Sequence, residues 1–270
     1  MGDREAKEVD LANVFWVSGP QRSGTTLMQQ ILQSNLPRCP NLVENSFVTG
    51  ILRAYKTQFG DLSKVNVVFG SDEELKDFTG RILAHYVAMV SRRFPGSEYL
   101  VIKDPGLIAL GEHLLDFCSP TRVVLMARNP YDIFRSHMRI GNRESRSSIG
   151  SRKYVYGRTT LNALMSKINM QFSDLLVAVR SGQNVFLYED LVKDPLETIS
   201  QISNISGVPL RSTTKLEWPA VETLHKPSWR SELVGGPISS ASLRRRKEKL
   251  TREVVDGLAP AYEIYSNLAT

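Results

Sequence analysis

The sequence predicts an α/β fold in which a parallel β-sheet is flanked by helices, built as one domain. Short apolar runs alternate along the chain with longer segments of helical periodicity. Runs that are apolar along their whole length are typical of parallel strands buried on both faces. The 270 residues, 41% of them hydrophobic, show no internal repeat or linker. We therefore expect a single domain over 1–270, with a flexible N-terminus over 1–12.

The elements follow from local patterns taken in chain order. The predicted strands are 14–18, 99–102, 122–127 and 184–188, and the predicted helices are 25–33, 46–55, 71–94, 160–180, 195–206 and 251–268. The helix at 71–94 has the clearest signal, because Ser71 and Glu74 form a capping box ahead of apolar residues at helical spacing. Pro105 and Pro130 each follow a predicted strand closely and indicate the start of a helix.

The strand ends locate the candidate site. In open sheets with parallel strands, ligands bind beyond the carboxyl ends of the strands. The residues at those ends are Gly19–Thr26, Lys103, Arg128 and Tyr188. These are the positions at which we look for function.

Charge and composition exclude several classes of protein. The net charge of +6 comes from two basic segments, 135–158 and 244–252, while acidic side chains outnumber basic ones elsewhere. Neither segment carries a nucleic-acid reader motif, so we do not expect nucleic-acid binding. No apolar run approaches the ~20 residues that span a bilayer, and the charged N-terminus is not a secretory signal. We expect a cytoplasmic protein without a membrane partner.

The cysteines and histidines give no metal signature. Cys39 and Cys118 lie far apart, and the four histidines show no ligand spacing. We therefore expect two reduced thiols and no metal site.

A phosphate-binding loop follows the first predicted strand. Residues 19–26 read GPQRSGTT, with two glycines four residues apart and a helix start immediately after them. Backbone N–H groups at a helix N-terminus bind anions, and glycines let the backbone approach the ligand. The segment differs from the nucleotide-triphosphate loop GxxxxGK[ST], because Thr25 stands where that loop has Lys. Arg22 supplies a cation within the loop instead.

Three segments resemble a known family. PQRSGTTLM (20–28), MARNPYDIFRS (126–136) and YEDLVKDP (188–195) occur in the order found in sulfotransferases that use 3′-phosphoadenosine 5′-phosphosulfate (PAPS). The motif sequences are most similar to those of the tyrosylprotein branch of that family. The resemblance implies a P-loop type of α/β fold, and its three segments lie within residues 14–206.

The resemblance also implies which residues bind the donor. It assigns the 5′-phosphosulfate to the loop residues Arg22, Ser23, Gly24, Thr25 and Thr26. It assigns the 3′-phosphate to Arg128 and Ser136, and a further donor contact to Tyr188. A Lys-Pro stretch, LHKPSW (224–229), would give Lys226 a phosphate role.

The same resemblance implies the catalytic groups. Lys103 resembles the family's catalytic Lys after the second strand, and together with Arg22 it would stabilise charge on the leaving oxygen. Asp104 and Pro105 follow it, so the His base of the cytosolic branch is missing. Glu44 stands near the place of the Glu base in the tyrosylprotein branch. The alternatives are that Glu44 caps the helix at 46–55 and that Lys103 is a surface residue.

Together these observations predict a sulfotransferase. It would move a sulfuryl group from PAPS to a hydroxyl, or to an amine or carbamoyl nitrogen, of a small-molecule or glycan acceptor. Adenosine 3′,5′-bisphosphate (PAP) would leave, and no metal would be needed. Two alternatives stay open: a P-loop kinase that uses ATP, and a non-catalytic module that binds nucleotide or nucleic acid. The sequence does not indicate an oligomeric state.

Overall fold

The computed structural model describes residues 10–61, 63, 67–144, 161–214, 238 and 249–270. Within these ranges four parallel strands form one sheet in the order β2-β1-β3-β4. The strands are β1 (Val14–Ser18), β2 (Leu100–Lys103), β3 (Val123–Ala127) and β4 (Asn184–Leu187). The predicted fold class is confirmed, and each predicted strand lies within one residue of its observed bounds at either end.

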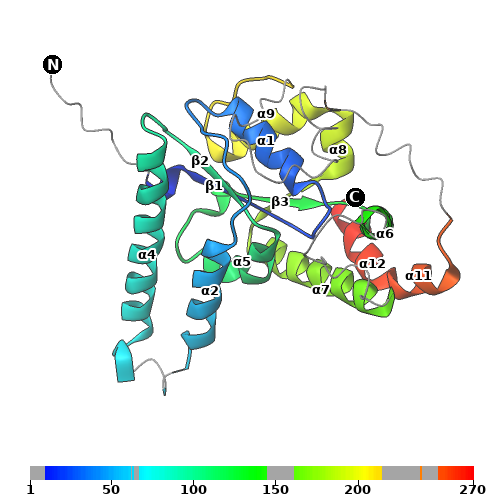
Figure 1. The fold of residues 1–270 in the computed structure, drawn as a ribbon, viewed down its shortest axis with the longest axis horizontal. Coiled ribbons are helices and arrows are strands. Elements are labelled where there is room, and N and C mark those ends of the chain that lie inside the picture. The colour runs from blue at the N-terminus through cyan, green and yellow to red at the C-terminus, as the bar shows by residue number, and fades with distance from the viewer. Residues whose placement is uncertain (1–9, 62, 64–66, 145–160, 215–237, 239–248) are drawn as a thin grey trace.

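Helices cover both faces of the sheet (Figure 1). One face carries α1 (Thr25–Asn35), α8 (Tyr188–Lys193) and α9 (Pro195–Ser206). The other face carries α2 (Phe47–Gln58), α4 (Asp72–Arg93), the 3-10 helix η2 (Pro105–Leu110), α5 (Gly111–Leu114) and α7 (Leu161–Arg180). Alternate residues of β1 enter the two cores: Phe15 and Val17 pack with α1, while Val14 and Trp16 pack on the opposite side.

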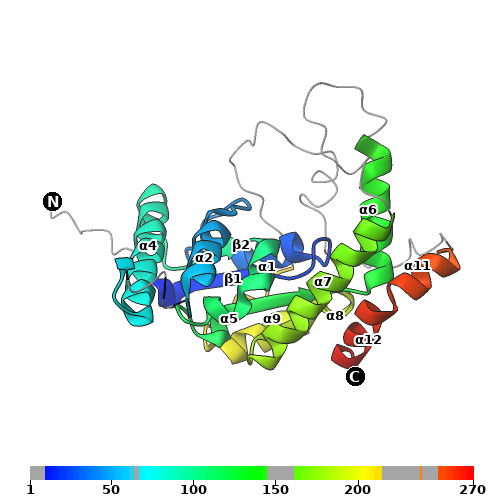
Figure 2. The same ribbon diagram turned by 90° about the horizontal axis from the view of Figure 1, so that it is seen from below.

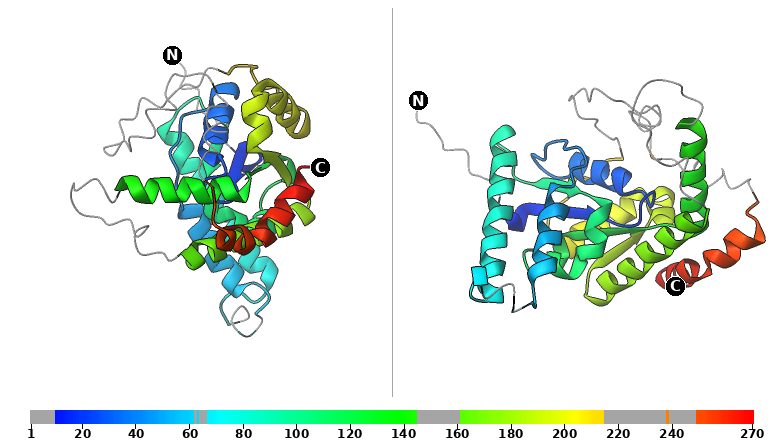
Figure 3. Two further views of the ribbon diagram at one scale, coloured as in Figure 1. Left: turned by 90° about the vertical axis from the view of Figure 1, so that its right-hand side faces the viewer. Right: turned by 60° about the horizontal axis from the view of Figure 1, so that its bottom comes forward.

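One helix leaves the body of the molecule. α6 (Pro130–Glu144) starts just after β3 and projects beyond the sheet, and α7 runs back toward the core (Figure 2). The chain closes with α11 (Arg252–Gly257) and α12 (Ala259–Leu268), which lie beside α6 and α7 (Figure 3). The single helix predicted over 251–268 is therefore wrong. It divides at Leu258, because Pro260 lies in the first turn of α12 and cannot donate to a preceding helix.

Local capping explains the other helix starts. The Ser71 hydroxyl accepts from the N–H of Glu74, as the capping box predicts. Asp104 caps η2, and Asp194 caps α9. The helix start expected at Pro105 is thus the start of a 3-10 helix. Two further 3-10 turns, η1 (Leu11–Asn13) and η3 (Pro120–Arg122), precede β1 and β3. Of the predicted flexible segment 1–12, residues 1–9 lie outside the described residues.

No helix in the described ranges combines the length and apolar character needed to cross a membrane. Cys39 and Cys118 are both free, as expected.

Candidate functional site

The loop after β1 is shaped by two glycines. Gly19 has φ +144°, and a Cβ there would stand 2.2 Å from the backbone oxygen of Met126. Gly24 has φ +102° and is the N-cap of α1; a Cβ there would stand 2.4 Å from the ring of Tyr188. Any other residue would clash with β3 at one end of the loop and with α8 at the other. The glycines thus let the loop pack against both neighbours while α1 presents its first N–H groups beyond the sheet.

Arg22 lies at the turn of this loop in a left-handed conformation, with φ +74°. A non-glycine residue in this region is strained, and such strain clusters at functional sites. Its Nε donates to the hydroxyl of Ser136 on α6 at 3.2 Å. Ser23 beside it is fully buried, and its hydroxyl has no partner among the described residues. A buried hydroxyl without a partner is costly and is satisfied if an anion occupies the loop.

Arg128, directly after β3, contacts the loop that follows β1. Its Nη1 donates to the backbone oxygen of Arg22 at 3.4 Å, and its Cζ lies 4.3 Å above the ring centroid of Tyr188. The side chain is only 8% exposed, and its Nε has no partner in the described part of the chain. A guanidinium held over an aromatic ring can still use its N–H groups to bind a phosphate. Among the described residues, no carboxylate forms an ion pair with Arg128.

Two side chains of helix α7 form hydrogen bonds with Gln21 of the loop. The Gln171 side-chain oxygen accepts from the backbone N–H of Gln21 at 3.3 Å. Lys167 Nζ donates to the side-chain oxygen of Gln21 at 2.8 Å. His137, buried next to Ser136 on α6, has its pKa lowered to about 4 by desolvation and by the charges of Lys167 and Arg22. It is therefore neutral at pH 7 and adds no charge to the loop.

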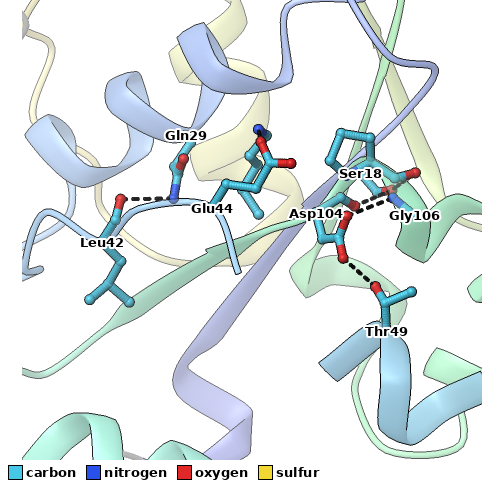
Figure 4. A network of polar contacts seen from close by, with 9 residues as sticks. Ser18, Gln29, Leu42, Glu44, Thr49, Asp104 and Gly106 are labelled. Carbon is cyan, nitrogen blue, oxygen red and sulfur yellow. Dashed lines mark hydrogen bonds and ion pairs between the residues drawn. The ribbon is translucent and has the colours of Figure 1, made fainter. Parts of the chain in front are cut away.

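Glu44 and Lys103 form an ion pair at the carboxyl end of β2. Lys103 is 3% exposed, whereas the Glu44 side chain is 50% exposed. The start of α2 is held by Asn45, whose side-chain oxygen accepts from the N–H of Phe47 at 2.7 Å. The hypothesis that Glu44 caps this helix therefore fails, as does the surface position for Lys103. Figure 4 shows Glu44 on the loop that joins α1 to α2.

Burial lowers the pKa of the Lys103 ammonium. The carboxylates of Glu44 and Asp104 oppose this effect, and the positive charge of Arg22 adds to it. Lys103 pairs in register with Val17 of β1, so the ion pair lies beside the start of the loop that follows β1. A buried cation at this place can stabilise negative charge without a metal.

Sequence reasoning missed several residues of this site. Lys167 and Gln171 were not selected, and Gln21 was included only as part of the loop 19–26, because a hydrogen bond between the loop and a helix 150 residues away leaves no local pattern. Asp104 was noted only as the residue that follows Lys103, and it was given no role. Glu189, whose carboxylate accepts from the N–H of Asn129 at 3.1 Å, lies in the segment that resembles the family, and that resemblance is the one signal that could have selected it.

Some predicted residues cannot be located. Lys226 and most residues of the two basic segments fall outside the described residues.

A cavity of about 620 Å³ opens at the amino ends of β1 and β3, at the edge of the sheet opposite to the site. Its arginine, Arg122, donates to the backbone oxygens of Ala12 and Ser206, so the cavity offers no uncommitted guanidinium. In the described ranges, no three His, Cys, Asp or Glu side chains group as metal ligands would.

The comparisons with known proteins agree with this geometry. A family model described as "Sulfotransferase family" matches residues 15–212, which include the loop, the ion pair, Arg128, Ser136 and Tyr188. The chain belongs to the sulfotransferase family. Members of the family are enzymes, and PAPS is their usual sulfuryl donor. No curated protein sequence matches this sulfotransferase.

Solved structures share the fold of this sulfotransferase. The sulfotransferase domain of the olefin synthase from Synechococcus PCC 7002 is 16% identical, with a TM-score of 0.58 and 98% of each chain covered. The sulfotransferase domain from the curacin biosynthetic pathway is also 16% identical, with a TM-score of 0.53 and 97% and 99% of the two chains covered. At this identity the likeness establishes the fold alone.

Proposed function

We propose that this sulfotransferase transfers the sulfuryl group of PAPS to a hydroxyl of a small-molecule or glycan acceptor, with Glu44 as the base. The observation that carries the proposal is the Glu44–Lys103 ion pair beside the loop of Arg22. A half-exposed carboxylate, a buried cation and a phosphate-type loop are the groups that metal-free transfer of a charged group needs.

The loop and its neighbours fit the donor. N–H groups of residues 23–26 at the start of α1, with the Arg22 side chain and the hydroxyls of Ser23, Thr25 and Thr26, would hold the 5′-phosphosulfate. Arg128 and Ser136 would hold the 3′-phosphate, with Tyr188 supporting the guanidinium. The buried Ser23 hydroxyl and Arg128 Nε, both without partners in the described ranges, support this arrangement. Lys226 remains a proposed phosphate ligand on the resemblance alone.

Each catalytic group has one task in the transfer. Glu44 takes the proton from the acceptor hydroxyl, and the new S–O bond forms as the bond to the phosphate oxygen breaks. Lys103 and Arg22 offset the charge that develops on that leaving oxygen. PAP then departs with the electron pair of the broken bond. An amine or carbamoyl nitrogen could be the acceptor in the same geometry.

A thermal-shift titration tests the donor. PAP and ATP–Mg²⁺ are compared on the wild type and on Arg128→Ala. A ligand at ~100 times its Kd adds about 2.7 kcal/mol of stability, which such a titration resolves. Stabilisation by PAP alone, lost in Arg128→Ala, supports the proposal. Stabilisation by ATP–Mg²⁺ alone would replace it with the P-loop kinase.

A panel of acceptors then tests the transfer. PAP release from PAPS is followed in the presence of phenols, sugars and amines, on the wild type and on Glu44→Gln. Turnover that depends on Glu44 supports an enzyme with this base. PAP binding without any PAP release would favour the non-catalytic nucleotide-binding module instead.

A further inference from the structure

Asp104 immediately follows Lys103, and every polar group it has is engaged. Its N–H donates to the Val17 oxygen at 3.2 Å, and its backbone oxygen accepts from the Ser18 hydroxyl at 2.9 Å. One carboxylate oxygen accepts from the N–H of Gly106 at 2.8 Å, and the other accepts from the Thr49 hydroxyl at 2.5 Å. The side chain is buried, at 6% exposure. Such a carboxylate is not available to take a proton from an acceptor.

The hydrogen bond to Thr49 connects two elements of the site (Figure 4). Thr49 lies in the first turn of α2, five residues after Glu44. Asp104 lies at the end of the strand that carries Lys103. The bond therefore ties the segment of the proposed base to the strand of its cationic partner.

The opposite side of the same segment is tied to the phosphate-loop helix. The backbone oxygen of Leu42 accepts two hydrogen bonds from α1, at 3.1 and 3.2 Å. The donors are the side-chain amides of Gln29 and Gln33. Glu44 is thus held between two anchors, one on α1 and one on Asp104. The side chain itself stays half-exposed, where an acceptor can reach it.

The joint between Thr49 and Asp104 is closely packed. A Cβ on Gly106 would stand 3.1 Å from the Thr49 methyl and 3.2 Å from the nearer Asp104 carboxylate oxygen. A side chain at position 106 would therefore press on both partners of the Thr49–Asp104 hydrogen bond, and glycine leaves them undisturbed.

We propose that Thr49 and Asp104 are positioning residues, whose hydrogen bond sets the Glu44 carboxylate against Lys103 in the geometry that proton transfer requires. The inference rests on the proposed function. Its physical basis is that displacement of a catalytic group by about 1 Å costs about 100-fold in rate. Both side chains are buried and are engaged with each other.

The test uses Thr49→Val, which keeps the side-chain shape and removes the hydroxyl. Thr49→Ser keeps the hydroxyl. Thr57→Val is the matched control, because Thr57 lies on the same helix, is exposed, and donates only to the Arg53 oxygen of its own helix. The measurements are the unfolding temperature, the Kd for PAP, and the kcat for PAP release from PAPS across pH, with water or a simple phenol as acceptor.

We expect Thr49→Val to lower kcat about 10- to 100-fold while the Kd for PAP stays unchanged. Thr49→Ser should restore kcat, and Thr57→Val should match the wild type. The alkaline limb of the kcat profile should move to lower pH in Thr49→Val. This shift follows because Glu44 and Asp104 raise the pKa of Lys103, against burial and Arg22, and a displaced Glu44 raises it less.

A Thr49→Val enzyme with wild-type kcat and pH profile would overturn the inference, and so would a loss that Thr49→Ser does not restore. If Thr49→Val fails to fold, Thr49→Ala decides the question, because it removes the hydroxyl without adding bulk, leaves the charge of Asp104 in place, and must show the same loss and pH shift. A wild type that binds PAP but releases none from PAPS would overturn the proposed function, and the inference with it.

Discussion

The guanidinium carbon of Arg128 lies 4.3 Å from the ring centroid of Tyr188, and the same ring lies directly against Gly24. The relationship joins three segments of the chain, the ends of β3 and β4 and the loop after β1. It orients Arg128 without using its Nε, which stays buried and without a partner among the described residues. The arrangement prepares the guanidinium for a bidentate contact with a phosphate.

Arg128→Lys should therefore weaken PAP binding about 10-fold or more. A lysine neither stacks flat on Tyr188 nor donates two parallel hydrogen bonds, and such charged hydrogen bonds contribute about 1.5–3 kcal/mol each. Isothermal titration with PAP measures the effect. Arg122→Lys is the matched control, because Arg122 bonds to backbone oxygens at the opposite edge of the sheet. Equal affinity in Arg128→Lys and the wild type would contradict the phosphate role.

Gly24→Ala should abolish PAP binding. The new methyl would meet the Tyr188 ring at 2.4 Å, and the φ of +102° is unfavourable for any residue with a Cβ. Gly207→Ala separates the two effects, because Gly207 also has a positive φ, +66°, but nothing lies within 4 Å of its Cβ position. Gly207→Ala should lose about 1–2 kcal/mol of stability from its φ alone, and Gly24→Ala should lose more because the clash with Tyr188 adds to it. Retained PAP binding in Gly24→Ala would show that the loop does not hold the donor.

Glu44→Gln should lower kcat by about 100- to 10,000-fold, the usual contribution of a general base. The Kd for PAP should change little, because Glu44 is absent from the loop and from the Arg128 cluster. The kcat values of Glu44→Gln and the wild type with PAPS measure the loss of rate, and a PAP titration of each measures the Kd. Glu98→Gln is a suitable control, since Glu98 pairs with Arg38 at an exposed position. A Glu44→Gln enzyme with normal turnover would remove Glu44 as the base and leave the fold unaffected.

The stability of the protein should fall in mild acid because of His137. Burial, together with the charges of Lys167 and Arg22, lowers its pKa from 6.5 to about 4. As the pH falls, the unfolded chain binds a proton at this histidine before the folded protein does. The stability that neutral His137 contributes is therefore complete above about pH 6.5 and is lost between pH 6.5 and pH 4. The loss amounts to roughly 3 kcal/mol.

Chemical denaturation at pH 7 and pH 5 measures this dependence. His137→Gln should flatten it, whatever its effect on stability at pH 7. His85→Gln, at an exposed position on α4, should keep the wild-type dependence. If both variants behave as the wild type does, the acid sensitivity arises elsewhere in the chain.

Local patterns were sufficient to predict most of the fold. The four strands are short and apolar, and the helices at 71–94 and 195–206 carry their own caps in Ser71 and Asp194. The end of the chain was predicted less well, since Pro260 divides a pattern that reads as one helix. The loop residues 19–26 could also be selected locally, because glycine spacing and a helix start lie within one short segment.

The pairing of the site was decided only by tertiary structure. Sequence by itself determined that Glu44, Lys103, Arg128 and Tyr188 follow strands or helices of an α/β fold. It did not determine that Glu44 meets Lys103, 59 residues away, or that Arg128 stacks on Tyr188. Parallel strand order β2-β1-β3-β4 gathers these carboxyl ends along one edge. That order depends on how the crossover helices pack, and packing between distant segments leaves no periodicity in the chain.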